Sequence, residues 1–400
     1  MNRHKAVMFV LDSFWPNQDG VSTVVQYLSE GLVEKGHDVC VLANAKGRDL
    51  PAREEHNGVV IRRMNIATRW PIYYKAMDDK SDIQNYHDVV VEYAPDVIII
   101  ESLCSWSNDW FMTFADELSC QKILHLHSDI SDYGVYGWRK VDYKVRNIGN
   151  ILYQIRMQHK AGNYWKSIND SLCKYNMLLY LTDVHTNIRA LGQRSICHVE
   201  KLENAVDDIF FEESLSHENI ENDVCRFLCV ANYMERKNQR YLLEAYERAT
   251  FQSKTELIIV GNGSKAYMEG LQDFANEIVK KDNGYKNIVF YRGIARDKIL
   301  ELYKISHIFV LSSIWEESPI VVREAAACGM PVISTDVGDV RTIEGCRVVH
   351  SVNEMASSMA EYERDLNLRK THGQQLSNWA QKHCRRSVAV DRLEQLINRE

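Results

Sequence analysis

The chain has 400 residues, of which 45% are hydrophobic and 26% charged, and its formal net charge is −7. This length is too great for one hydrophobic core and predicts two domains of about 200 residues each. The composition is that of an ordinary globular protein, the negative charge argues against nucleic acid as the main partner, and no apolar run reaches the roughly 20 residues that cross a bilayer.

The first residues and the cysteines indicate a cytoplasmic protein. Residues 1–16 have too short an apolar core for a signal peptide and lack a small-residue cleavage site, so we expect a first strand there. The ten cysteines show no spacing typical of zinc sites. Cys225 and Cys229 lie in a strand-like run, which predicts buried thiols in a reducing compartment.

Short apolar runs alternate with helical stretches, which predicts parallel sheets. The strands expected in the first half are residues 6–11, 39–43, 59–62, 96–100, 123–127 and 178–182. Those expected in the second half are 226–231, 256–260, 288–291, 308–311 and 332–334. The acidic segment 212–223 is expected to be a linker or surface loop between the two series.

Two such series predict an α/β fold with two doubly wound, Rossmann-like domains that face a central cleft, where the carboxyl ends of parallel strands bind ligands. We place the first domain at residues 1–200 and the second at 201–375. Residues 376–400 are expected to form a C-terminal helix that packs back toward the first domain.

The segment 315–335 contains the clearest chemical signal. It lies between two expected strands and consists of a loop and the start of an Ala-rich helix. Pro319 suits the first helical position, where the missing N–H costs nothing. The amides of Ile320, Val321 and Val322 then lack partners within the helix and are able to hold an anion such as phosphate.

Two carboxylates flank this helix start. Glu316 and Glu324 are eight positions apart, a little over two helical turns, so they can reach different parts of one long ligand. Carboxylates suit sugar and ribose hydroxyls, and amides suit a diphosphate. The pattern therefore favours a nucleotide-sugar site, and the alternative is an ordinary amphipathic helix with two solvated glutamates.

The segment resembles the signature of the retaining glycosyltransferases of family 4, which have the GT-B fold. Their pattern is a Glu, seven residues, a second Glu, an Ala-rich helix, a Gly, Pro-Val and a Val-Gly loop. The matching residues here are Glu316, Glu324, the alanines 325–327, Gly329, Pro331-Val332 and Val337-Gly338-Asp339.

The resemblance extends over nearly the whole chain. His127 falls where the family has a His that faces the transferred sugar, and Lys237 matches a Lys at the donor diphosphate. The chain departs from the pattern at Asp19, which replaces the first Gly of a pair ending at Gly20, and at Asn232, which replaces an Arg. Further matches are Gly36-His37-Asp38-Val39, Glu203-Asn204-Ala205-Val206-Asp207, Gly261-Asn262-Gly263 and Arg292-Gly293.

The resemblance implies a retaining hexosyltransferase that uses a nucleotide-sugar donor and needs neither a metal nor another cofactor, because cations and helix amides replace the ion. It places Glu316, His127 and Lys237 at the catalytic centre. The donor-binding residues that it implies are Gly20, Asn232, Lys237, Ser318, Pro319, Ile320, Val321 and Glu324. Glu316 is assigned to the sugar's hydroxyls and Glu324 to the ribose, so the pair is not a hydrolase acid–base couple.

Several of these residues have simpler interpretations when each is taken alone. Lys237 would be a solvated charge, His127 a structural histidine and Gly20 a turn glycine. Because Asn232 removes one cation, either Arg236 or another basic residue replaces it, or the enzyme is weak or inactive. The alternatives to a transferase are a non-catalytic nucleotide-sugar-binding homologue and a GT-B epimerase or sugar-phosphate synthase.

The segment 139–174 concentrates positive charge in an acidic chain. It has eight basic residues against two acidic ones, and Ile148, Ile151, Leu152 and Ile155 repeat at helical spacing. Such a helix suits an anionic membrane, so we expect a peripheral protein at the inner face of the cell membrane. The expected acceptor is lipid-linked or a glycan in surface polysaccharide synthesis, and the alternative for this segment is a helical hairpin whose apolar stripe is core.

Overall fold

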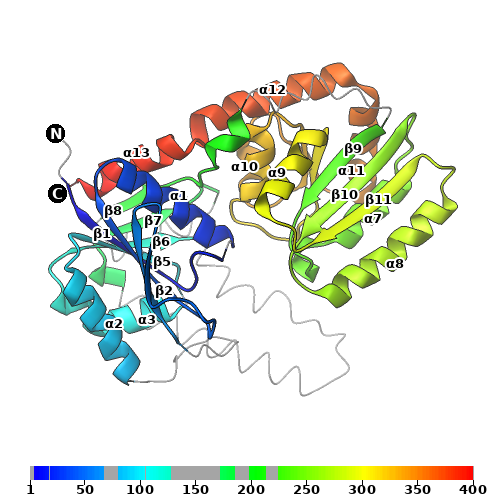
Figure 1. Cartoon of the computed structure of the whole chain (residues 1–400). Helices are drawn as coiled ribbons and strands as arrows, with labels where there is room; N and C mark the ends of the chain where they lie inside the picture. The colour runs from blue at the N-terminus through cyan, green and yellow to red at the C-terminus, as the bar shows by residue number, and fades with distance from the viewer. Residues whose placement is uncertain are drawn as a thin grey trace. The chain divides into compact units, whose positions relative to one another are not determined.

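The structure is a computed structural model that describes residues 4–17, 19–66, 80–103, 105–127, 172–184, 198–212 and 224–399. The chain divides into two compact units, and each contains one sheet covered by helices (Figure 1). The first unit comprises Met1–Glu203 and Ala389–Glu400, and the second comprises Asn204–Val388. The α/β class with two parallel-sheet domains is confirmed.

The first unit has an eight-stranded sheet with the order β3-β4-β2-β1-β5-β6-β7-β8. The chain starts in the middle at β1 and continues on both sides, which is the doubly wound arrangement. Its neighbouring strands are parallel, except that β3 pairs antiparallel with β4. The strands are β1 Ala6–Leu11, β2 Asp38–Asn44, β3 Arg53–His56, β4 Val59–Met64, β5 Val97–Glu101, β6 Gln121–Leu126, β7 Met177–Tyr180 and β8 His198–Lys201.

The second unit has a six-stranded, wholly parallel sheet with the order β11-β10-β9-β12-β13-β14. Its strands are β9 Val224–Val230, β10 Lys254–Gly261, β11 Lys286–Arg292, β12 Ile308–Leu311, β13 Val332–Thr335 and β14 Arg347–Val349. Apolar side chains fill both faces, as expected of parallel strands that are covered on both sides.

The helices that the structure describes cover these sheets (Figure 1). In the first unit they are α1 Gly20–Glu34, α2 Lys80–Tyr93 and α3 Trp106–Phe114. In the second unit they are α7 Gln239–Arg248, α8 Lys265–Lys281, α9 Arg296–Ile305, α10 Ile320–Ala327, α11 Val352–Arg364 and α12 Leu366–His383; α13 Arg386–Ile397 follows. Among these described helices, none has the length and apolar character that crossing a bilayer requires.

The predicted strands are present, with ends that differ by one or two residues, but β3, β8 and β14 were not predicted. Each of the three lies at an edge of its sheet. Their sequences, REEH, HVEK and RVV, are short, and the first two are rich in charge, as edge strands often are because charge discourages pairing with other chains. They therefore lack the apolar run that identified the central strands.

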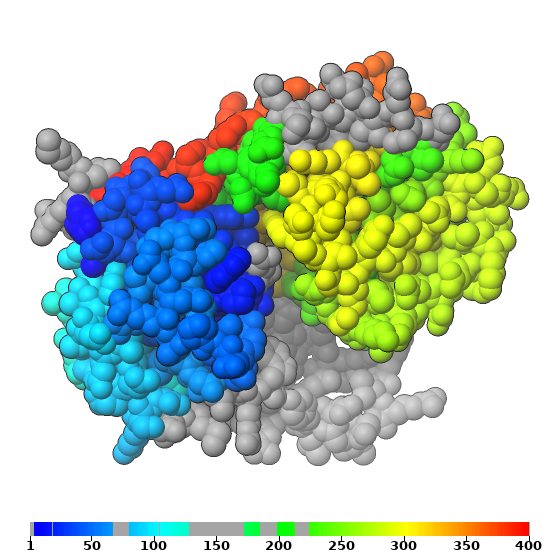
Figure 2. Space-filling view, in the orientation of Figure 1, coloured from blue at the N-terminus to red at the C-terminus, as the bar shows by residue number. Residues whose placement is uncertain are grey.

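The last helix packs against the first unit, and α13 lies beside α1 (Figures 1 and 2). A Cβ on Gly31 would come within 2.3 Å of Val390 Cγ2, so this glycine permits the close contact. His37, from the predicted Gly-His turn, has its Nε2 3.4 Å from Glu394 Oε1, and Lys35 Nζ is 2.8 Å from Glu394 Oε2. The boundaries between the two units lie at residues 203/204 and 388/389, whereas the sequence predicted boundaries at 200/201 and 375/376.

Cys40, Cys120, Cys225, Cys229 and Cys346 are free thiols. Cys225 and Cys229 are buried in β9, as predicted. Burial raises the pKa of both thiols to about 12, so they stay protonated at neutral pH. We infer that these two thiols serve as small apolar core groups.

Candidate active site

Glu316 lies in the loop between β12 and α10 and is buried. The Ser313 hydroxyl donates a hydrogen bond to Glu316 Oε1 at 2.6 Å, and the Lys237 ammonium donates to the same oxygen. Arg236 Nη1 lies 3.5 Å from Oε2. The carboxylate therefore sits between two cations, which offsets the cost of removing its charge from water.

Both cations come from a 3₁₀ turn, Glu235–Lys237, that follows β9. The turn is fixed to the Glu316 loop, because the Ile314 amide donates to the Arg236 carbonyl at 2.8 Å and Arg236 Nη1 donates to the Trp315 carbonyl at 3.0 Å. The Arg236 guanidinium also lies 5.1 Å from the centre of the Trp315 ring. Two segments about 80 residues apart in the sequence thus form one polar cluster.

The start of α10 differs from the sequence prediction. Pro319 is the N-cap, with ψ of 113°, and does not occupy the first helical position. The Val322 amide donates to the Pro319 carbonyl at 3.1 Å, so it is not available to an anion. The amides of Ile320 and Val321 have no acceptor in the part of the chain that the structure describes. These two amides remain as candidate phosphate donors.

The Val337-Gly338-Asp339 loop packs against the loop that contains Glu316. Gly338 has φ of +52°, and a Cβ there would come within 2.1 Å of the Glu317 carbonyl oxygen, so the contact requires glycine. The buried Asp339 accepts from the Ser318 hydroxyl at 3.1 Å and from Arg323 Nη2 at 2.5 Å. The hydroxyl of Ser318, a predicted donor-binding residue, is therefore used to hold the loop.

Glu324 faces a different set of groups. It is 1% exposed, the Arg296 guanidinium donates to Oε1, and the Tyr303 hydroxyl donates to Oε2 at 2.9 Å. Burial raises the pKa of Tyr303 well above its usual value, so this hydroxyl remains a donor. A ribose hydroxyl that binds Glu324 would have to share its carboxylate with the Arg296 guanidinium or displace that guanidinium.

We predict that Glu324→Gln raises the donor KM by about 10-fold, the value of one hydrogen bond to a charged group, and changes kcat little. Ribose contacts are made equally in the ground and transition states, so their loss weakens binding without slowing the chemical step. Steady-state kinetics over a range of donor concentrations measures both constants. Glu301→Gln, an exposed carboxylate on α9 that pairs with Lys298, is the matched control. An inactive Glu324 variant beside an active Glu316 variant would show that the motif is misassigned.

Asn232 occupies a supporting position at the end of β9. Its Oδ1 accepts from the Asn262 amide at 3.1 Å, and its carbonyl accepts from Gln239 Nε2 at 2.9 Å. The Gly261-Asn262-Gly263 turn packs closely here, because a Cβ on Gly261 would come within 2.1 Å of the Ala231 carbonyl oxygen. Asn232 thus tethers this turn. The sequence predicted that Arg236 or another basic residue replaces the arginine that the family has at position 232, and Arg236 does lie beside Glu316.

Gly20 is the first residue of α1, and Asp19 is the N-cap. The Asp19 carboxylate accepts from the Ser22 amide at 2.9 Å, the Ser13 hydroxyl at 2.9 Å and Asn17 Nδ2 at 2.8 Å. A carboxylate at a helix N-terminus is stabilising. It would also compete with a donor phosphate for the same end of α1, which is the consequence of Asp19 replacing a glycine.

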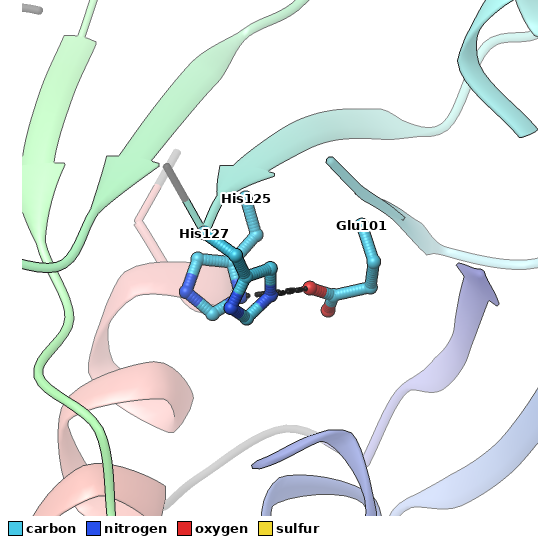
Figure 3. A group of neighbouring side chains, drawn as sticks. All are labelled: Glu101, His125 and His127. Carbon is cyan, nitrogen blue, oxygen red and sulfur yellow. Dashed lines mark hydrogen bonds and ion pairs between the residues drawn. The ribbon is translucent and has the colours of Figure 1, made fainter. Parts of the chain in front are cut away.

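His127 follows β6 and is grouped with Glu101 and His125, the three side chains pointing toward one another (Figure 3). His127 Nε2 is 2.5 Å from Glu101 Oε2, and His125 Nδ1 is 3.0 Å from the same oxygen. Burial would raise the pKa of Glu101, but attraction to His125 and the close polar contacts of both imidazoles outweigh it and lower the pKa to about 2. Burial and repulsion by His125 lower the pKa of His127.

The donor atoms of these three residues lie within 4.8 Å of one another, so this cluster, among the residues described, is one that could hold a metal ion. Glu101 was not predicted from the sequence. Its only signal was its place at the end of the strand next to β6, where its register partner is His125.

Comparison with known proteins agrees with this architecture. The family model "Glycosyl transferases group 1" matches residues 210–378, and the "Glycosyl transferase 4-like domain" matches residues 19–147. The structure of sucrose-phosphate synthase from Thermosynechococcus elongatus aligns with a TM-score of 0.74 and 16% identity over 98% of each chain. The two family models together match most of the chain, so it is a glycosyltransferase, and its fold is GT-B.

Two other solved GT-B structures are similar over most of this glycosyltransferase. WaaG, a glycosyltransferase involved in lipopolysaccharide biosynthesis, aligns with a TM-score of 0.68 and 14% identity over 98% of this chain and 100% of that one. A trehalose-6-phosphate synthase studied for enzymatic glycosyl transfer with retention aligns with a TM-score of 0.70 and 11% identity over 98% of each chain.

Two relatives in sequence are each a component of a phosphatidylinositol N-acetylglucosaminyltransferase. The Arabidopsis thaliana protein is 22% identical over 340 residues, which is 84% of this glycosyltransferase and 68% of the relative. The Homo sapiens protein is 24% identical over 344 residues, 84% of this chain and 62% of the relative. The chain thus spans less than two thirds of the human relative's length.

Proposed function

We propose that this glycosyltransferase is a retaining hexosyltransferase that moves a sugar from a nucleotide-sugar to a lipid-linked or glycan acceptor in the synthesis of a surface polysaccharide. The observation that carries the proposal is the position of Glu316. It lies beside Lys237 and Arg236, in the loop that leads to the first amides of α10. Cations and a carboxylate in one cluster, followed in the chain by the first amides of α10, match the diphosphate and the sugar of such a donor.

In this proposal the donor diphosphate binds to Lys237, Arg236 and the amides of Ile320 and Val321. These groups are fixed by the fold before the donor arrives, so they stabilise the charge that develops on the leaving diphosphate without reorganising. No metal is then needed at the diphosphate. Glu316 binds hydroxyls of the transferred sugar, and the buried Asp339 network keeps its loop in place.

Retention of the anomeric configuration rests on the family resemblance and is supported by the similar fold of the trehalose-6-phosphate synthase studied for that stereochemistry. The leaving phosphate oxygen takes the acceptor's proton in such a reaction. His127 is assigned by the resemblance to the transferred sugar, where it would position the ring. WaaG is involved in lipopolysaccharide biosynthesis, which supports a role in surface polysaccharide synthesis. The two sequence relatives are components of a phosphatidylinositol N-acetylglucosaminyltransferase, which supports a lipid acceptor.

The proposal is tested with a panel of UDP- and GDP-sugars in a thermal-shift experiment, followed by a donor-hydrolysis assay without acceptor. A nucleotide-sugar that binds the native state raises its melting temperature. We expect one donor class to stabilise the protein and to be hydrolysed slowly. Stabilisation without hydrolysis would favour a non-catalytic homologue, for which the substitutions at Asp19 and Asn232 are the argument. No stabilisation by any donor would contradict the proposal.

Two further alternatives remain distinguishable by their products. A GT-B epimerase would convert the donor sugar into its epimer with the nucleotide still attached, and a sugar-phosphate synthase would transfer the sugar to a sugar phosphate. Chromatography of the reaction with each class of acceptor separates these products from a glycosylated lipid or glycan.

The segment 139–174, for which the sequence predicts membrane binding, lies outside the described residues except for its last three. In that part the Lys174 ammonium donates to Asp116 Oδ2 at 2.6 Å and to the Met112 carbonyl at 3.0 Å, so it is committed to the fold and not to a membrane. We propose that the remaining basic residues of the segment hold the enzyme at an anionic membrane surface, where a lipid-linked acceptor would lie.

This association predicts sedimentation with anionic but not with neutral liposomes. Changing Lys140, Lys144, Arg146 and Arg156 to Gln should weaken binding by about 10³-fold, since each cation near the surface contributes about 1 kcal/mol. The matched control changes Lys265, Lys280, Lys281 and Lys298 to Gln, four exposed lysines of the second unit. Equal binding of the two variants, or no preference for anionic lipid, would contradict the proposal.

A further inference from the structure

The cluster of Glu101, His125 and His127 is formed by two neighbouring parallel strands. Glu101 is the last residue of β5 and pairs in register with His125 in β6. His127 follows two residues later and so returns to the same side of the sheet. The three side chains converge at the carboxyl ends of these strands, where doubly wound sheets bind ligands (Figure 3).

The proton arrangement follows from burial and charge. The Glu101 side chain has no exposed surface, and its low pKa of about 2 makes it an anion at neutral pH that can only accept hydrogen bonds. The ring nitrogen that faces it at 2.5 Å, His127 Nε2, must therefore carry a proton. Because the pKa of His127 is lowered, the ring is neutral at neutral pH and its other nitrogen, Nδ1, keeps a lone pair.

The same distances distinguish a shared proton from a shared metal ion. Two ligands that each lie about 2.0 Å from one tetrahedral ion are separated by about 3.3 Å. His127 Nε2 and Glu101 Oε2 are closer, at 2.5 Å, which is a short hydrogen bond. His125 Nδ1 is 3.0 Å from the same oxygen without completing a hydrogen bond to any described residue, so the Glu101–His127 contact is the directional one.

We propose that Glu101 is a positioning residue for His127: it holds the imidazole as the Nε2–H tautomer and so leaves Nδ1 as a hydrogen-bond acceptor for a hydroxyl of the transferred sugar. The role of the sugar rests on the proposed function, whereas the tautomer does not. The His127 side chain is 8% exposed and those of Glu101 and His125 are 0% and 1%, so His127 is the member that a ligand can reach. A neutral acceptor at this place binds a hydroxyl without adding positive charge beside the developing cation of the sugar.

The tautomer is measured on the full-length protein labelled with ¹⁵N-histidine, using long-range ¹H–¹⁵N correlation, with the His127→Asn spectrum to assign the signal. We expect the Nε2–H form in the wild type at neutral pH. Glu101→Met removes the acceptor and should produce a mixture of both tautomers. Glu101→Gln keeps a carbonyl acceptor without the charge, so it should retain much of the Nε2–H form.

A titration of the same signals adds a second readout. Glu101 raises the pKa of His127, as does the charge of Asp19, while burial and His125 lower it. Removing the Glu101 charge should therefore shift the His127 titration to lower pH in both variants. The Glu101→Gln variant allows this measurement even if the Glu101→Met variant does not fold. Glu92→Gln, an exposed carboxylate that binds Arg62 in the same unit, is the matched control and should shift nothing.

Donor hydrolysis supplies the functional arm. We expect kcat to fall by about 10²-fold in Glu101→Met and less in Glu101→Gln, with donor KM nearly unchanged, because misplacing a positioned group mainly slows the reaction. An Nδ1–H tautomer in the wild type, a tautomer unchanged in Glu101→Met, or a stoichiometric metal bound through His127 Nε2 would overturn the proposal. A wild type with the expected tautomer but no activity on any donor would instead contradict the proposed function.

Discussion

Replacing Glu316 with Gln is expected to lower the rate of glycosyl transfer by about 10³-fold or more while the second unit stays folded. A contact made mainly in the transition state costs about 10²–10³ when it is lost, and Glu316 combines its proposed sugar contact with control of both cations. The Gln side chain can still accept from Ser313, and Arg236 keeps its bond to the Trp315 carbonyl. The local fold therefore does not depend on the charge.

The same variant should bind the nucleoside diphosphate at least as tightly as the wild type. In the wild type Glu316 accepts from the Lys237 ammonium, and removing the carboxylate frees that ammonium for the diphosphate. Calorimetry with UDP and GDP, beside the transfer assay, measures the two effects separately. Glu317→Gln, a buried neighbour in the same loop, serves as the control for disturbance of the loop. Loss of binding together with activity would mean that Glu316 supports the fold of the site and not the reaction.

Replacing Lys237 with Ala is expected to lower kcat by about 10²-fold, the usual effect of losing one charge partner of the transition state. Lys237 has a side chain that is 15% exposed, so its charge acts in a partly dry environment where it counts for more than at the surface. The variant leaves Glu316 with Ser313 and Arg236 as partners. We expect a lower melting temperature but a folded protein.

Lys265→Ala, an exposed lysine on α8, is the matched control for Lys237→Ala and should keep full activity. EDTA should leave the wild-type rate unchanged, because cations and amides of the chain are proposed to replace a metal at the diphosphate. Full activity of Lys237→Ala, or a strict requirement for an added divalent ion, would contradict that part of the proposal.

The central strands and the order of the motifs were predictable because they depend on local pattern. Apolar runs such as VIIIE in β5 identify a strand from its own residues, whereas edge strands such as β3 carry charge and give no such run. The helix start at α10 was predicted within one residue, but a proline is compatible with both the N-cap and the first helical position. Because Pro319 is the N-cap, the Val322 amide donates to its carbonyl and is not available to an anion.

The supporting contacts of the site were not predictable for a different reason. Ser318 meets Asp339 across 21 residues, Asn204 Nδ2 donates to the Ser318 carbonyl across 114, and Glu101 meets His127 across 26. These pairs are set by how the elements stack, and no single segment shows them. The resemblance indicated Glu316 and Lys237 as functional, but not that they bind one another.

The most direct test of the central claim is the anomeric configuration of the sugar released first from an α-linked donor, followed by ¹H NMR in the presence of EDTA. The proposed retaining, metal-independent transferase should release the α anomer before mutarotation mixes the two forms, and Glu316→Gln should release almost none. Initial release of the β anomer would contradict the retaining mechanism, and release only after EDTA is replaced by a divalent metal would contradict the role assigned to Lys237, Arg236 and the amides of α10.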